Sequence, residues 1–75
     1  MNTHNEWKNL LSIFNEDLEK TGYSLFIVEP EEGFYACEIL KNGELVETYA
    51  ENYYEDELSD LITDAAHHVL TYLAR

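Results

Sequence analysis

Apolar residues in the N-terminal part of the chain recur at helical spacing. Positions three or four apart carry Trp7, Leu10, Leu11, Phe14 and Leu18, with polar or charged residues between them. Gly22 follows this stretch, and glycine can take the left-handed conformation that ends many helices without strain. Thr3 and Glu6 have the spacing of a capping box, which satisfies the first backbone N–H groups of a helix. The pattern predicts a first helix over about residues 4–20.

Aromatic and β-branched residues dominate the next part of the chain. We predict a strand over 23–29, a turn over 30–33 (Pro-Glu-Glu-Gly), a second strand over 34–41 and a third over 44–50. The last two strands are joined by Asn42-Gly43. This pair is typical of a type I′ hairpin turn, because both central positions of that turn need positive φ.

Helical spacing returns in the C-terminal part. Its apolar positions are Leu58, Leu61, Ile62, Ala65, Ala66, Val69 and Leu73. Asn52, with Glu55 three residues later, is predicted to be the N-cap of this helix. The element order is therefore α-β-β-β-α, an α+β fold in which a three-stranded antiparallel meander is flanked by N- and C-terminal helices. Both helices can lie on one face of the meander. We expect residues 1–75 to form a single domain.

The predicted hairpin separates the two faces of the sheet. Counting from a two-residue turn pairs Lys41 with Glu44 and places Glu38 opposite Glu47. The predicted core face carries Tyr35, Cys37, Ile39, Val46, Thr48 and Ala50. The second face carries Phe34, Ala36, Leu40, Leu45 and Tyr49 around the two carboxylates. Either Glu38 and Glu47 simply point into water at small cost, or this face is an exposed patch for a partner. Helices packed on both faces would bury it instead.

Negative charge is the strongest compositional feature. The formal net charge is −12, from 16 acidic and 4 basic residues, and no Lys or Arg occurs between Lys41 and Arg75. The helix macrodipole favours the acids of 55–57 at the start of the second helix, but it does not account for Asp60 and Asp64. A field of this sign repels nucleic acids and anionic membranes and attracts basic protein surfaces.

The order of elements is similar to that of double-stranded-RNA-binding domains. Those domains present basic residues to phosphates at the start of their last helix. The corresponding segment here is Tyr53-Tyr54-Glu55-Asp56-Glu57, in which the charge is inverted. The resemblance is therefore one of element order alone, and we do not expect direct binding to DNA or RNA.

Candidate catalytic and metal-binding residues are few. Cys37 lies in an apolar stretch and is interpreted as a small buried hydrophobic residue rather than a nucleophile. Asp64, His67 and His68 have the spacing of a weak helical metal site, but a solvent-facing Asp–His pair is the simpler interpretation. We predict no enzyme activity, no cofactor and no metal site. A single cysteine and the lack of any signal-like segment favour a cytoplasmic protein.

These features favour a binding module. The most specific hypothesis is an inhibitor that engages a basic protein surface by imitating nucleic-acid phosphates; such DNA mimics are commonly small, acidic and encoded by phages, which is a similarity of type and not of motif. The predicted partner-binding residues are Glu47, Glu51, Tyr53, Tyr54, Glu55, Asp56, Glu57, Asp60 and Asp64. Tyrosines within this segment suit an interface because they bring rigid contact area with a polar tip. The alternatives are an accessory or self-associating domain, such as a homodimer, whose acidity serves solubility only, or a weak metal or small-ligand binder.

Overall fold

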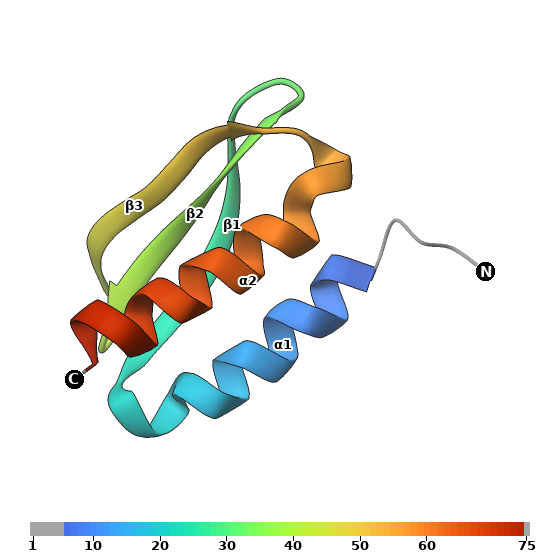
Figure 1. Ribbon diagram of the computed structural model, residues 1–75. Coiled ribbons are helices and arrows are strands. Elements are labelled where there is room, and N and C mark those ends of the chain that lie inside the picture. The colour runs from blue at the N-terminus through green and yellow to red at the C-terminus, as the bar shows by residue number, and fades with distance from the viewer. Residues whose placement is uncertain (1–5, 75) are drawn as a thin grey trace.

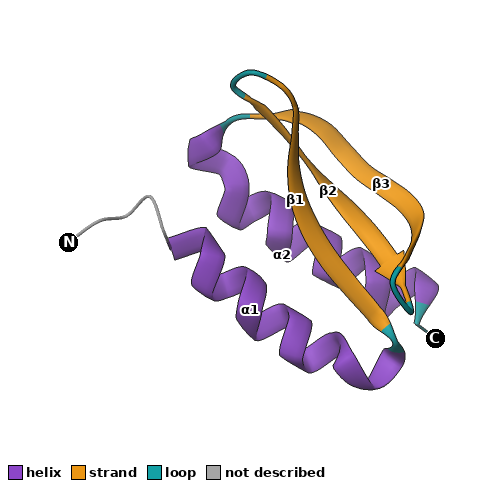
Figure 2. Cartoon of the chain, turned by 180° about the vertical axis from the view of Figure 1, so that it is seen from behind, coloured by secondary structure: helices purple, strands orange, loops and turns teal. Residues whose placement is uncertain are grey.

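The computed structural model describes residues 6–74, with the backbone alone at Glu51 and Asn52. Its elements are α1 (Glu6–Leu18), the 3₁₀ turn η2 (Glu19–Thr21), β1 (Tyr23–Glu31), β2 (Phe34–Lys41), β3 (Glu44–Tyr53), the 3₁₀ turn η3 (Glu55–Glu57), α2 (Leu58–His68) and the π-helical turn η4 (Val69–Leu73). The strands form an antiparallel sheet in the order β1-β2-β3, and both helices lie on one face of it (Figure 1 and Figure 2). The predicted α-β-β-β-α fold is confirmed.

The first helix ends as its sequence predicts. At Gly22 φ is 85°, and its N–H donates to the carbonyl of Glu19 at 3.1 Å. The positive φ favours glycine at this position, where a Cβ would also stand 2.8 Å from Oδ1 of the Asn42 side chain. The other half of the prediction, the capping box, depends on Thr3, which lies outside the described residues.

The β2–β3 hairpin turns where predicted but changes register soon afterwards. Asn42 and Gly43 have φ of 51° and 87°, as a type I′ turn needs. Lys41 pairs with Glu44, and the next pair also follows the predicted register. Ile39 then pairs with Glu47, because Val46 is an extra residue that forms a β-bulge.

This bulge reverses the predicted faces of β3. Glu47 and Tyr49 lie on the helix-covered side, paired with buried residues of β2, whereas Thr48 pairs with Glu38 on the other side. The prediction that Glu38 opposes Glu47 is therefore wrong, and so is the placement of Val46 and Thr48 in the core: both are exposed. The inserted residue moves Glu47, Thr48 and Tyr49 to the faces opposite those predicted, whereas Ala50 packs against the core as predicted.

Both outer strands are longer than predicted. β1 continues through Pro30 to Glu31, with a register shift after Val28. Proline is tolerated there because β1 is an edge strand. β3 continues to Tyr53 through a second irregularity at Ala50, whose φ is 57°.

The start of the second helix also differs from the prediction. Asn52 lies within β3, so its predicted role as N-cap is wrong. The extended residue before the helical turn is Tyr54, whose N–H donates to Oε1 of Glu57 at 3.0 Å. The N–H of Glu57 donates in return to the carbonyl of Tyr54 at 2.9 Å. This reciprocal pair replaces the predicted Asn52 cap, and the strand can therefore run on to Tyr53.

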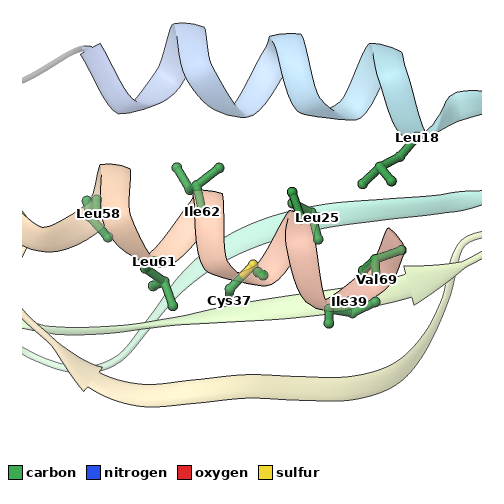
Figure 3. Packing of buried hydrophobic residues seen from close by; sticks show 10 residues of the cluster. Leu18, Leu25, Cys37, Ile39, Leu58, Leu61, Ile62 and Val69 are labelled. Carbon is green, nitrogen blue, oxygen red and sulfur yellow. The ribbon is translucent and has the colours of Figure 1, made fainter. Parts of the chain in front are cut away.

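The core fills the space between the helices and the sheet (Figure 3). Its fully buried members are Leu18, Leu25, Cys37, Ile39, Leu58, Leu61, Ile62, Ala65, Ala66 and Val69. No polar or charged side chain of the described residues is buried with them. Within residues 6–74, no helix combines the length and apolar character that crossing a bilayer requires.

Candidate functional site

Five acidic residues of the predicted binding segment share one solvent-exposed surface. Glu55, Asp56 and Glu57 form η3, and Asp60 and Asp64 follow on α2; all five are exposed. The opposite side of α2 supplies half of the core, so the acids occupy the side that the sheet and α1 leave open. We call this set the acidic surface. Glu57 is partly engaged in capping the helix, whereas Asp60 and Asp64 lie beyond the cap.

The two neighbouring tyrosines of the segment have different environments. Tyr53 is half-buried, pairs with Tyr35 across the sheet and packs against the core. Tyr54 is 55% exposed, and its ring centroid lies 5.3 Å from that of Phe34. Of this pair, Tyr54 is therefore the one available to a partner.

Glu47 does not belong to the acidic surface, because its carboxylate contacts His68. Nε2 of His68 lies 3.0 Å from Oε2 of Glu47, and the imidazole packs between the rings of Tyr49 and Tyr72 at 4.9 and 5.4 Å. No acceptor is aligned with Nε2 for a hydrogen bond, although this atom is shielded from solvent, so the contact with Glu47 is electrostatic rather than a directed bond. Of Glu51, only the backbone in β3 is described.

Asp64 connects the acidic surface with this histidine cluster. Burial raises the pKa of Tyr49, and the nearby charge of Asp64 adds to the shift, followed by smaller effects that include Glu47. Two acids of the predicted site, Asp64 and Glu47, therefore act on the same tyrosine. The structure also corrects the proposed Asp–His pair, because His68 is paired with Glu47 of β3 rather than with Asp64 on its own helix.

Candidates for chemistry are not organised into a reactive site. Cys37 is fully buried, and burial raises the pKa of its thiol to about 12. Among the described residues, no three His, Cys, Asp or Glu side chains lie close enough together to hold a metal ion. A wide, shallow depression of about 420 Å³ lies beside the end of α1 and is lined by Ser12, Asn15, Glu16, Glu19 and Tyr23, among others. The amide of Asn15 is already bonded to the backbone of Leu25.

A second exposed surface lies on the side of the sheet away from the helices. We call it the outer face; strand alternation assigns to it Ser24, Phe26, Val28, Phe34, Ala36, Glu38, Leu40, Leu45 and Thr48. Of these residues, Ala36 is fully buried. Phe26 and Leu45 are more than half exposed. The part of this face on β2 and at Leu45 was predicted from the sequence, but Tyr49 and Glu47 were wrongly predicted to lie there. Phe26 was not predicted, because β1 is apolar at both alternating sets of positions and its pattern does not indicate which set faces the helices.

No family model, no curated protein and no solved structure matches the chain.

Proposed function

We propose that this domain is a cytoplasmic binding module that engages a basic protein surface. The observation that carries the proposal is the acidic surface on η3 and α2, whose five carboxylate residues are all exposed. The lysines of the described residues are Lys8 on α1, Lys20 in η2 and Lys41 at the end of β2. None of these lysines lies on η3 or α2. Such a one-sided field steers oppositely charged proteins toward it.

The spacing of the acids supports the more specific proposal of a nucleic-acid mimic. Asp60 and Asp64 are one helical turn apart on the exposed side of α2, and Asp56 precedes them by the same interval. Exposed carboxylates along α2 and in the turn η3 before it would offer a nucleic-acid-binding protein a series of charges in place of phosphates. A binding role rather than catalysis is further supported by the inaccessible thiol of Cys37.

The decisive experiment compares two double variants with the same net charge. Asp60→Asn with Asp64→Asn removes two charges from the acidic surface, whereas Glu16→Gln with Asp17→Asn removes two exposed charges from α1. Tagged wild-type and variant proteins are used to capture partners from cell extract at low and high salt. We expect the α2 variant to lose basic partners that the α1 variant retains, and wild type to lose them at high salt because the encounter is electrostatic.

Two results would contradict the proposal. Equal loss with both double variants would mean that net charge alone matters, and retention by both at high salt would mean that the acidity serves solubility. The nucleic-acid-mimic version makes one further demand: duplex DNA added to the captured complex should displace the partner, because both would occupy the same basic surface.

A further inference from the structure

The outer face of the sheet is an apolar surface that no helix of the described chain covers (Figure 2). Phe26 is 58% and Leu45 is 55% exposed, and Val28, Phe34 and Leu40 beside them are half-buried. Contiguous apolar surface of this kind, rimmed by polar residues, is typical of interaction sites.

The edges of the sheet are less suited to a partner than this face. On the β1 edge, the side chain of Asn15 occupies both backbone hydrogen-bonding groups of Leu25. Its Oδ1 accepts from the Leu25 N–H at 2.7 Å, and its Nδ2 donates to the Leu25 carbonyl at 3.1 Å. Pro30 removes a further donor from the same strand. On β3, the irregularities at Val46 and Ala50 interrupt the row of backbone groups that an added strand would use.

One carboxylate stands in the middle of the apolar surface. Glu38 is half-buried and lies between Phe26 on β1 and Thr48 on β3 in a single cross-strand row. A molecule that covered the face would take this charge out of water, and a desolvated charge without a counter-charge is costly. The occupant must therefore bring a cation to this position.

The lysines of the described residues do not supply that cation. Lys41 lies on the helix side, where its Nζ donates to the Thr21 carbonyl at 2.8 Å and sits 4.3 Å from the Tyr23 ring centroid. Lys8 and Lys20 belong to α1 and η2. A second copy would bring another Glu38 and a further net charge of −12. Self-association through this face is therefore disfavoured.

We propose that the outer face docks a protein segment that presents an arginine among apolar side chains. This inference rests on the proposed function, because it specifies the basic partner. Arginine fits better than lysine: its planar group can bond a carboxylate with two parallel hydrogen bonds, is weakly hydrated and stacks on aromatic rings such as Phe26. The contact between Tyr54 and Phe34 joins this face to the acidic surface, so one basic partner can engage both.

The test uses two synthetic peptides of equal charge, titrated into ¹⁵N-labelled protein. One peptide alternates leucine with arginine, and the other alternates glycine with arginine. We expect the leucine–arginine peptide to bind about tenfold more tightly and to shift the amide signals of Phe26, Glu38 and Leu45. Addition of salt should weaken both peptides.

Matched variants locate the contact. Phe26→Ser and Glu38→Gln should each weaken the leucine–arginine peptide by about tenfold, the loss of one anchoring contact. The controls are Ile13→Ser and Glu16→Gln on α1; Ile13 is 54% exposed, close to the 58% of Phe26. They should leave the affinity unchanged. Circular dichroism of each variant confirms that it is folded.

The outcomes separate this inference from the proposed function. Equal binding of the two peptides, with shifts confined to η3 and α2, would overturn the docking surface and leave the basic-partner proposal standing. Failure of both peptides to bind at low salt would overturn both. A concentration-dependent dimer in analytical ultracentrifugation that Phe26→Ser dissociates would replace the arginine-bearing partner with a second copy.

Discussion

The two faces of this sheet are made by the same three strands, yet they have different physical states. On the helix side, Leu25, Cys37 and Ile39 are at most 1% exposed. On the outer face, their immediate chain neighbours Phe26, Glu38 and Leu40 are exposed or half-buried. Hydrophobicity alone does not distinguish the faces, because Phe26 is as apolar as Leu25. What differs is that both helices pack against one side only.

This contrast separates the apolar residues that stabilise the fold from the apolar residues that remain exposed. The chain is short, so it buries only about 60–65% of its unfolded surface, and most of its apolar residues are needed for the single core. Apolar residues left on the outer face contribute little to that core. They therefore give surface that a partner can use without the fold depending on it.

The largest expected effect comes from two adjacent residues of β1 that point to opposite faces. Leu25→Ala should lower the free energy of unfolding by about 2–5 kcal/mol, because it leaves a cavity in the core. Phe26→Ala should cost about 1 kcal/mol or less, since its ring is 58% exposed. Urea titrations of both variants measure the difference. Equal losses would mean that the outer face is packed as tightly as the core.

The next effect concerns the thiol in the centre of the helix-covered face. Burial raises the pKa of Cys37 from 9.0 to about 12, so below pH 9 the thiol is protonated in both folded and unfolded chains. Between pH 9 and 12 only the unfolded chain releases the proton. This one group should therefore lower the free energy of unfolding by about 1.4 kcal/mol per pH unit over that range.

Alkaline unfolding of wild type and Cys37→Ala checks this expectation. The variant should show a shallower dependence on pH, with some slope remaining because the pKa values of Tyr35 and Tyr49 are also raised. As a comparison between faces, Thr48→Cys in the Cys37→Ala background should react readily with iodoacetamide, whereas native Cys37 should not. An identical alkaline slope in the two proteins would contradict a buried thiol.

The smallest expected effect is a difference in stability between variants of two carboxylates on neighbouring strands. Glu47→Gln should cost up to about 1 kcal/mol, because it removes the ion pair with His68 on the helix side. Glu38→Gln should change stability by less than about 0.5 kcal/mol, because Glu38 forms no ion pair among the described residues and is partly exposed. Urea titrations of both variants measure the difference. A larger loss for Glu38→Gln would assign it a structural rather than a recognition role.

The positions of the predicted binding residues could be read from the sequence only where local patterns determine them. The exposed acids of η3 and α2 follow from helical spacing, since the apolar stripe fixes which side faces the core. The sequence could not distinguish the half-buried Tyr53 from the exposed Tyr54, because they are adjacent tyrosines and the strand was predicted to end before them. The pairing of His68 with Glu47 depends on the packing of α2 against β3, which no short-range pattern encodes.

The sequence by itself determined the order of the elements, the turns at Gly22 and Asn42-Gly43, and the sign of the surface charge. These features depend on backbone preferences and periodicity that act over a few residues. Only the tertiary structure decided which side of β3 is covered. The extra residue at Val46 lets Glu47 and Tyr49 reach α2, and such a bulge is selected by packing against the helix rather than by local propensity. That choice placed Glu38 in the open apolar face and removed Glu47 from it.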